Sequence, residues 1–442
     1  MNIAICGLIS NHFHLFNGLE SYLHKNGHTV YYFEPDYTGG VCLFNSGKPY
    51  TTSQCYPQKG SYTPSSLEDM LGYELSLIQY ETKDSNKRIK RTKILQINAR
   101  QKAFFYKSVF TRFKIDLIIV WGGINFNTAV AVSVAREMNK KTILLEKGLY
   151  PRTLQVDTEG VNTLNSQKYK FREFIQCPNN YSLEYYQNRV LEKWEFQQPL
   201  DSVSWKNKVL YLLKEEQYKD LLSRIADRII FSKKEKIFSF KPEYHLTDPT
   251  NTHSDNHFPS QFLFVPMQVS DDSQVLSHGK WIMNNEGLID AVLNAVCRTG
   301  LDIPIVVKPH PSEYRRIDYQ HLKEKYSTIY FSNAGTVDII KKSSMVVTIN
   351  STVGFEATLF RKPVVVLGDA LYSMSDIINK AANESELAVQ IQKNNGVMLP
   401  AQDVERFAAC AMNINVPCDF VDPQLEQIEF LWRYIVNLIS GS

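Results

Sequence analysis

The sequence predicts an α/β protein built from two successive domains, each with a largely parallel β-sheet. Short apolar runs alternate with stretches of helical spacing near the start of the chain, and the same alternation returns after residue 260. The length of 442 residues also exceeds the roughly 250 to 300 residues at which one hydrophobic core stops growing. Two α/β domains are therefore the expected architecture.

The first domain is expected over residues 1–180. Its opening reads as strand, helix and strand, and a later run that is apolar on both faces is typical of a central parallel strand covered by helices. Gly122-Gly123 end this run, and an Ala- and Val-rich helix follows. The expected elements are the strands Asn2–Cys6, Thr29–Phe33, Ile115–Trp121 and Thr142–Leu145 and the helices His12–His24 and Asn127–Met138.

Residues 181–260 are expected to form a helical connector that ends in an exposed loop. Ser182–Lys236 is charged, aromatic and helical in pattern, whereas His245–Ser260 has hardly any apolar residues. Residues 261–420 then predict the second domain, and residues 421–442 a final amphipathic helix over Gln424–Ile439. The expected strands of the second domain are Gln261–Pro266, Ile303–Val307, Thr328–Phe331, Met345–Ile349 and Pro363–Leu367.

Two parallel α/β domains in succession predict a ligand cleft between them, because open α/β sheets bind ligands at the carboxyl ends of their strands. The formal charge of +3 is too small to indicate nucleic-acid binding, and none is expected. Positive charge is clustered, however: Lys83–Lys114 carries eleven Lys or Arg and one acid, Asp84. We interpret this run as a solvated helix face, with an anionic substrate or lipid surface as the alternative. Lys233–Lys241, which interleaves aromatics with lysines, weakly indicates peripheral membrane contact.

The seven cysteines are dispersed and form no C-x-x-C pair, so neither a disulfide framework nor a zinc site is expected. The chain opens directly on a strand, and no apolar run reaches the roughly 18 residues that span a bilayer. The expected location is the cytoplasm, with peripheral attachment to the inner membrane as an option.

A candidate anion site lies where the strand Met345–Ile349 meets a helix expected over Val353–Phe360. The junction is Asn350-Ser351-Thr352, and a helix start with free N–H groups and small hydroxyls binds phosphate or carboxylate. Ser351 and Thr352 could instead act as N-caps only, but two hydroxyls and free N–H groups directly after an apolar strand favour the ligand role. Glu356 falls one turn into the same helix.

Polar residues also follow two other strands of the second domain. In Lys308-Pro309-His310-Pro311-Ser312, the imidazole of His310 could donate to a phosphate or protonate a leaving group. A lone histidine is more often structural, but its position at a strand end favours the functional role here. After the first strand, Asp271 and Asp272 could bind a metal, initiate a turn or supply a nucleophile. Spacing alone favours the turn.

Glu146 ends a buried strand of the first domain. A carboxylate in a closing cleft suits a general base, and an ion pair with Lys147 or a distant arginine is the alternative interpretation. Asp157-Thr158-Glu159-Gly160-Val161-Asn162 predicts a turn nearby.

Four ordered segments together resemble the capsule polysaccharide synthesis family of bacterial glycosyltransferases that transfer β-linked Kdo, an acidic eight-carbon sugar, from CMP-Kdo. They are EKGLYPR with DTEGVN, FVPMQVSDDSQV, KPHPSE and VVTINSTVGFEATLFRKPVVVLGDALY, and they span Glu146–Tyr372. The resemblance implies a GT-B-like scaffold of two Rossmann-like domains facing a central cleft. It also implies a retaining, metal-independent transfer without a cofactor.

The resemblance assigns roles to individual residues. Asp272, with Asp271 as the alternative, would attack the anomeric carbon, and Glu146 would deprotonate the acceptor hydroxyl. His310, Ser351 and Thr352 would stabilise the departing phosphate. The residues expected to bind CMP-Kdo are Gln268, Ser273, Gln274, Lys308, His310, Pro311, Asn350, Ser351, Thr352 and Glu356.

The expected partners are CMP-Kdo, a glycan or glycolipid acceptor of capsule or lipopolysaccharide (O-antigen) synthesis, and an anionic membrane surface. The sequence departs from the family pattern in the first domain, where Lys147 follows Glu146 and Arg152 comes only after Pro151. Two alternatives to the Kdo transferase are a GT-B transferase that uses CMP-sialic acid or a UDP sugar, and a non-catalytic protein that binds glycans or lipids.

Overall fold

The computed structural model describes residues 1–7, 12–33, 50–51, 60–195, 259, 261–313 and 319–441. Most of the expected connector, including the basic run Lys233–Lys241, lies outside these residues. The described chain packs as two units. One combines Met1–Val161 with the C-terminal segment from Asn415, and the other combines Asn162–Lys193 with the segment that ends at Ile414.

The first unit contains a seven-stranded sheet in the order β13-β6-β5-β4-β1-β2-β3. The strands from β5 to β3 are parallel, as expected of a Rossmann-like domain. Every side chain of β4 is buried, which suits a central strand covered on both faces. The strands are β1 (Asn2–Cys6), β2 (Thr29–Phe33), β3 (Tyr50–Thr51), β4 (Leu117–Trp121), β5 (Lys141–Lys147), β6 (Thr153–Asp157) and β13 (Val416–Pro417).

Two strands at one edge of this largely parallel sheet run antiparallel to their neighbours. β6 runs antiparallel to β5, and β13 runs antiparallel to β6. The short loop between β5 and β6, closed by a bond from the Gly148 N–H to the Thr153 carbonyl at 2.8 Å, permits only a hairpin, because a parallel crossover needs a dozen or more residues. The first sheet is therefore parallel with an antiparallel edge.

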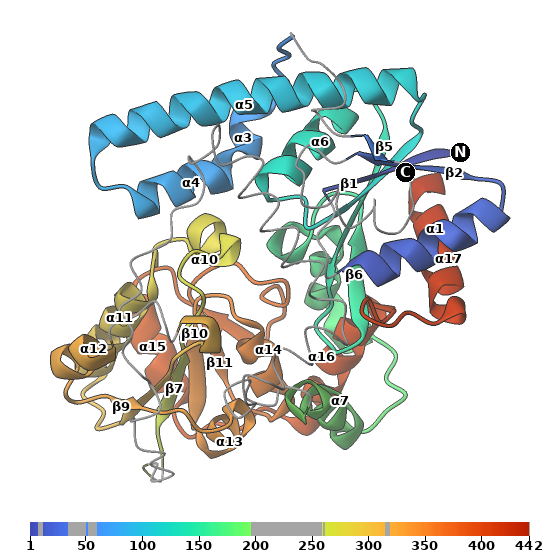
Figure 1. The fold of residues 1–442 in the computed structure, drawn as a ribbon. Helices are drawn as coiled ribbons and strands as arrows, with labels where there is room; N and C mark the ends of the chain where they lie inside the picture. The colour runs from blue at the N-terminus through green and yellow to red at the C-terminus, as the bar shows by residue number, and fades with distance from the viewer. Residues whose placement is uncertain are drawn as a thin grey trace, which may run out of the picture. The chain divides into compact units, whose positions relative to one another are not determined.

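Helices cover both faces of the first sheet. Ile3 and Ile5 pack with α1 and α17, whereas Ala4 and Cys6 point to the opposite face and pack with α5 and α6. The C-terminal helix thus completes the core of the unit that the N-terminus begins, as Figure 1 shows. The helices are α1 (Phe13–Lys25), α3 (Leu67–Met70), α4 (Gly72–Glu81), α5 (Ser85–Arg112), α6 (Phe126–Glu137) and α17 (Leu425–Ser440).

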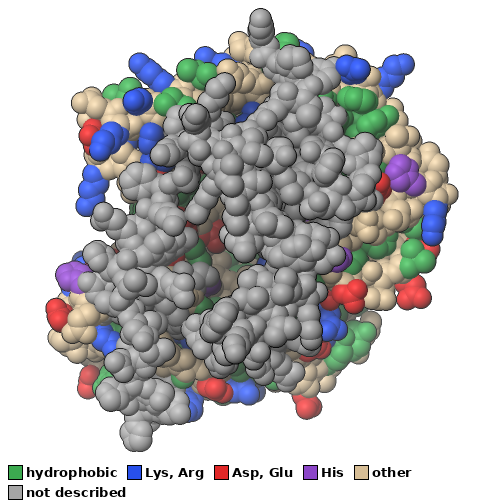
Figure 2. All heavy atoms as spheres, viewed as in Figure 1, with side chains coloured by type: hydrophobic (Ala, Val, Ile, Leu, Met, Phe, Trp, Pro, Cys, Tyr) green, Lys and Arg blue, Asp and Glu red, His purple; other side chains and the backbone are tan. Residues whose placement is uncertain are grey.

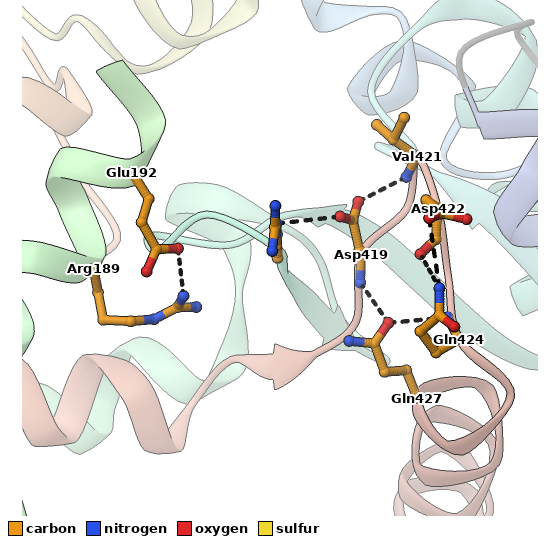
Figure 3. Close-up of polar contacts among 8 residues, drawn as sticks. Arg189, Glu192, Asp419, Val421, Asp422, Gln424 and Gln427 are labelled. Atoms are coloured by element: carbon orange, nitrogen blue, oxygen red, sulfur yellow. Dashed lines mark hydrogen bonds and ion pairs between the residues drawn. The ribbon is translucent and has the colours of Figure 1, made fainter. Parts of the chain in front are cut away.

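A compact set of hydrogen bonds fixes the start of α17. Gln427 Oε1 accepts from the backbone N–H groups of Asp419 at 3.3 Å and Gln424 at 3.2 Å, and Asp419 Oδ1 accepts from Val421 at 3.0 Å (Figure 3). Arg152, from the segment EKGLYPR, lies with Nε 3.5 Å from Asp419 Oδ2. Figure 3 also shows the ion pair between Arg189 and Glu192, one turn apart on α7.

The second unit contains a six-stranded parallel sheet in the order β12-β11-β10-β7-β8-β9. The chain starts in the middle, at β7, builds outward through β8 and β9, and then builds the other side through β10, β11 and β12. This is the Rossmann order, which reverses between β7 and β10. The strands are β7 (Leu263–Pro266), β8 (Ile305–Lys308), β9 (Tyr330–Phe331), β10 (Met345–Thr348), β11 (Val364–Val366) and β12 (Ile378–Lys380).

Both ends of α11 follow the capping rules. Asn284 Oδ1 accepts from the Gly287 N–H at 2.7 Å at the start of α11, and Gly300 closes that helix with φ +68°. The helices are η2 (Asn162–Leu164), η3 (Ser166–Gln176), α7 (Leu183–Glu195), α10 (Ser273–His278), α11 (Asn285–Thr299), η6 (Pro311–Glu313), α12 (Tyr319–Lys325), α13 (Thr336–Lys342), α14 (Thr352–Leu359), α15 (Glu384–Asn394) and α16 (Ala401–Asn413).

Candidate functional site

The second sheet brings three of the predicted segments to one edge. β7 lies between β8 and β10, and parallel strands end at the same edge of a sheet. Lys308–Pro311 follows β8, Gln268–Gln274 follows β7, and Asn350–Thr352 follows β10. The edge between β7 and β10 is the topological switch point, where α/β sheets of this kind bind their ligands. Strand order thus places the predicted site residues of this unit together.

Gln268 and Asn350 join the loops on either side of the switch point. Gln268 Nε2 donates to Asn350 Oδ1 at 2.8 Å, and Gln268 Oε1 accepts from the Asn350 backbone N–H at 3.0 Å and from the Thr348 hydroxyl at 3.3 Å. Asn350 Nδ2 in turn donates to the Gln274 carbonyl at 2.7 Å. Both side chains are only 7% exposed, so their amides hold the loops to each other. The expected contact of both residues with CMP-Kdo stays a prediction.

The candidate anion site at the end of β10 is a capped helix start. Ser351 Oγ accepts from the Val353 N–H at 3.2 Å, which confirms the N-cap interpretation of this residue. Thr352, the first residue of α14, is exposed. The Tyr372 hydroxyl donates to the Ser351 carbonyl at 2.5 Å and so holds the junction between β10 and α14 in place. A cap and a bound phosphate are compatible, because one hydroxyl satisfies only one of the free N–H groups at a helix start.

Glu356 lies on the inner side of α14, at 1% exposure. The burial of Tyr372 raises the pKa of its hydroxyl, and the nearby Glu356 raises it further, so this tyrosine stays a neutral hydrogen-bond donor to Ser351. The structure thus places Glu356 near Tyr372, the residue that bonds the backbone of the candidate anion site.

The two acidic residues after β7, Asp271 and Asp272, occupy different positions relative to α10. Asp272 is the N-cap of α10, and its Oδ1 accepts from the Gln274 N–H at 2.9 Å and the Ser273 hydroxyl at 3.3 Å. The cap uses Oδ1 and does not use Oδ2. Asp271 precedes it outside the helix, and all four residues from Asp271 to Gln274 are partly exposed. Within the described structure, the Gln274 amide nitrogen is buried without a hydrogen-bond partner, so it is a donor that the protein does not satisfy.

The loop after β8 is held by its own backbone. The Glu313 N–H donates to the His310 carbonyl at 2.8 Å, and Pro311 begins the short helix η6. Lys308 Nζ donates to the Ala334 carbonyl at 2.6 Å. Burial lowers the pKa of Lys308 to about 8. His310 is partly exposed.

Glu146 belongs to the first unit, where it lies near the carboxyl end of β5 opposite Gln155. Its Oε1 accepts from the Lys147 backbone N–H at 2.9 Å. The Lys147 ammonium lies 5.3 Å from the ring centroid of Phe420. Asp157 closes the following turn, with Oδ1 accepting from Glu159 and Gly160 at 2.7 and 3.0 Å, which confirms the predicted turn.

Sequence reasoning missed three residues that build the site's support. Ser270, Asn285 and Glu313 link the loops after β7 and β8, and the last two are buried at 4% and 1% exposure. Glu313 was within reach of the sequence, because it is the final letter of KPHPSE. Asn285 carries no such signal, since its position beside an N-cap asparagine predicts only a helix start.

Among the described residues, no group of three or more His, Cys, Asp or Glu could hold a metal ion. None of their helices is both long enough and apolar enough to cross a bilayer.

A model of the family described as "Capsule polysaccharide biosynthesis protein" matches residues 116–400, which include every candidate site residue named above. The chain belongs to the capsule polysaccharide biosynthesis family. It is 26% identical over 328 residues to protein FixF of Sinorhizobium fredii, a match that covers 74% of this chain and 61% of FixF. It is also 30% identical over 129 residues to the capsule polysaccharide modification protein LipB of Neisseria meningitidis, a match that covers 27% of this chain and 31% of LipB. The chain thus spans about three fifths of FixF and under a third of LipB in these matches.

Two solved structures show a distant likeness to this family member. The β-Kdo 2,7 transferase KpsC of Thermosulfurimonas dismutans matches at 16% identity and a TM-score of 0.34, over 69% of this chain and 79% of that one. The UDP-GlcNAc 2-epimerase of Neisseria meningitidis matches at 12% identity and a TM-score of 0.33, over 99% of this chain and all of that one. At such scores, neither structure adds to the family assignment.

Proposed function

We propose that this protein is a retaining glycosyltransferase that transfers Kdo from CMP-Kdo to a glycan or glycolipid acceptor in capsule or lipopolysaccharide synthesis. The observation that carries the proposal is the meeting of three polar loops at one switch point, inside the family match. One loop offers carboxylates, one an imidazole and a lysine, and one a hydroxyl-rich helix start. A carboxylate can act as the nucleophile at the sugar carbon. The imidazole, the lysine and the helix start can bind the nucleotide phosphate.

The proposed reaction has two displacements. In the first, Asp272 Oδ2 attacks the anomeric carbon of Kdo, the bond from that carbon to the phosphate oxygen breaks, and CMP leaves with the electron pair. His310, Lys308, Ser351 and the N–H groups at the start of α14 stabilise the charge on the departing phosphate. Gln274, whose amide donor is unsatisfied in the described structure, is available to a sugar or phosphate oxygen.

In the second displacement, Glu146 removes the proton of the acceptor hydroxyl. The acceptor oxygen then attacks the anomeric carbon and releases the Asp272 carboxylate. Two inversions at one carbon give net retention of configuration. The proposal needs no metal ion or cofactor, because the leaving group is stabilised by protein donors.

Intact-protein mass spectrometry after incubation with CMP-Kdo tests the proposal. We expect a species heavier by one Kdo residue, together with free CMP, and we expect an Asp272→Asn variant to give neither. A wild-type protein that releases no CMP and gains no mass, with or without a panel of glycan and glycolipid acceptors, would contradict it.

Another nucleotide sugar, such as CMP-sialic acid or a UDP sugar, is the alternative donor, because the same phosphate donors suit any nucleotide. A thermal-shift panel separates the two, since a ligand that binds the folded state raises the melting temperature. CMP should stabilise the protein, whereas UDP should not. A non-catalytic glycan- or lipid-binding protein would bind its ligand without releasing nucleotide from any donor.

We also propose that the enzyme meets its acceptor at an anionic membrane surface. α5 (Ser85–Arg112) carries nine Lys or Arg and no acid. Ile89 and Ile97 on this helix are 55% and 52% exposed. Figure 2 shows several Lys and Arg side chains over the region where Figure 1 draws α5. A basic helix face with exposed apolar residues matches the headgroup region of an anionic bilayer.

A further inference from the structure

A continuous chain of buried and partly buried hydrogen bonds connects the three loops of the candidate site. It begins at Glu313, whose Oε2 accepts from the Ser270 hydroxyl at 2.7 Å. The Ser270 hydroxyl oxygen accepts from Asn285 Nδ2 at 3.1 Å. Asn285 then bonds the Gln268 backbone twice, through Oδ1 to the N–H at 2.9 Å and through Nδ2 to the carbonyl at 2.7 Å. From Gln268 the chain continues to Asn350 and the loop after β10.

Asn285 anchors this chain of hydrogen bonds to a helix of the second unit. It is the first residue of α11, a fifteen-residue helix with a side-chain cap at one end and a left-handed glycine at the other. Leu288 and Val292 of this helix have no exposed surface and lie in the core of the second unit. The loop after β7 is therefore fastened to a helix that cannot shift without disturbing the core.

Glu313 fastens the second loop to the first. Its backbone N–H bonds the His310 carbonyl, so Glu313 and His310 share one turn. Its carboxylate reaches across to Ser270, which lies two residues before Asp272. One carboxylate–hydroxyl contact thus ties the loop that carries His310 to the loop that carries the acidic pair.

We propose that Glu313 and Asn285 are positioning residues that fix the spacing between His310 and Asp272. The inference rests on the proposed function, in which His310 and Asp272 act on opposite sides of the bond that breaks. Glu313 and Asn285 do not touch substrate themselves, because they are buried at 1% and 4% exposure. A misplacement of about 1 Å between reacting groups can cost on the order of 100-fold in rate.

The alternative is that these bonds only stabilise the fold. A purely structural role lowers the melting temperature but leaves the turnover of the folded molecules unchanged. A positioning role lowers kcat at nearly constant KM, because substrate still binds while the reacting groups are misaligned. The same hydrogen bond, removed from either side, should give the same loss.

The experiment compares Ser270→Ala, Glu313→Ala, the double variant and Glu313→Gln at a temperature where all are folded. We expect each alanine variant to lower kcat for transfer from CMP-Kdo by about 10- to 100-fold, with KM changed less than about threefold. The double variant should be no worse than the poorer single one. Glu313→Gln keeps an oxygen that accepts from Ser270, so it should recover most of the activity.

Tyr326→Phe is the matched control. It removes the bond from the Tyr326 hydroxyl to Asp290 Oδ1 at 2.7 Å, which also reaches α11 but joins none of the site loops. We expect this variant to lose stability and to keep its kcat. Equal kcat for all folded variants, or an equal loss in Tyr326→Phe, would overturn the inference.

Hydrogen exchange provides a readout that does not need activity. Ser270→Ala should raise exchange in peptides of both loops, 263–274 and 305–313, and Tyr326→Phe should raise it in neither. Unchanged exchange at 305–313 would show that the loops are not coupled and would overturn the inference. A wild-type protein that transfers no Kdo would instead overturn the proposed function, and the exchange result would still decide whether the two loops are coupled.

Discussion

The side chains of Gln268 and Asn350 bond to each other across the switch point of the second sheet, with Gln268 Nε2 2.8 Å from Asn350 Oδ1. The Asn350 backbone N–H returns a bond to Gln268 Oε1 at 3.0 Å. Strands β7 and β10 are neighbours only because the strand order reverses here. The amide pair therefore links two strands that are not consecutive in the chain, and it holds the loops after β7 and β10 to each other.

Removing this amide pair should cost stability. Gln268→Ala leaves the Asn350 backbone N–H buried without its partner, and a buried unsatisfied group costs about 1 to 3 kcal/mol. Asn350→Ala should cost a similar amount, and the double variant less than the sum, since each change removes the same bond. Urea unfolding of the four proteins measures this. Additive losses would show that the pair does not act as a unit.

The sequence predicted the second unit well because its strands are short, apolar on both faces and separated by helical spacing. It predicted the first unit less fully. β6 was not expected, and only its last residue, Asp157, had been assigned, to the start of a turn. β13 was not expected either, because a two-residue strand has no periodicity to detect. The C-terminal helix packs against the first sheet, and such a long-range tertiary contact is not encoded in the local sequence pattern.

The site was predicted where a residue type and its position carry chemistry, as for His310 after a strand or Ser351 before a helix. The connections between those residues were not. Asn285 and Glu313 matter through contacts with segments 17 and 43 residues away in the chain, and no sequence spacing predicts such contacts. The expected contact of Gln268 and Asn350 with the donor stays a prediction, but the bond between their two amides was not predicted.

Substitutions at Asp272 should separate capping from catalysis. Asp272→Asn keeps an oxygen that caps α10 and removes the charged nucleophile, so stability should change by less than about 0.5 kcal/mol while transfer and the Kdo adduct are lost. Asp272→Ala should lose the same activity and about 1 kcal/mol of stability in addition. Asp271→Asn is the control. If this control loses the adduct and Asp272→Asn retains it, the nucleophile is Asp271.

Ser351 allows the cap and the anion site to be tested apart. Ser351→Asp preserves an oxygen for the Val353 N–H and places a negative charge at the helix start, where it should stabilise the free protein slightly. The same charge should repel a phosphate and weaken CMP binding by at least about tenfold, given that one charge pair is worth about 1 to 4 kcal/mol near a surface. Calorimetric titration with CMP measures the change. Unchanged affinity would place the phosphate elsewhere.

If α5 contacts an anionic membrane, binding of the protein to anionic vesicles should depend on the positive charge of this helix. Lys87, Lys90 and Lys93 are exposed on this helix, and their replacement by Glu should weaken binding to phosphatidylglycerol-containing vesicles at low salt by at least about tenfold, since each lysine near the surface is worth about 1 kcal/mol. Lys341, Lys342 and Lys393 replaced by Glu give the same charge change elsewhere. Co-sedimentation measures binding. Wild-type protein that stays in solution, or equal loss in both triple variants, would contradict a role for this helix.

The lowered pKa of the Lys308 ammonium predicts the pH above which activity falls. Burial lowers its pKa to about 8 from the usual 10.5, so the folded protein binds fewer protons than the unfolded chain between these values and its stability should rise with pH across that window. The effect on activity has the opposite sign. If the ammonium stabilises the departing phosphate, kcat/KM should fall about tenfold per pH unit above 8. Lys308→Arg keeps its charge throughout this range, so its profile should lose that fall, whereas Lys308→Met should be slow and flat. An unchanged alkaline limb in Lys308→Arg would mean that another group sets it.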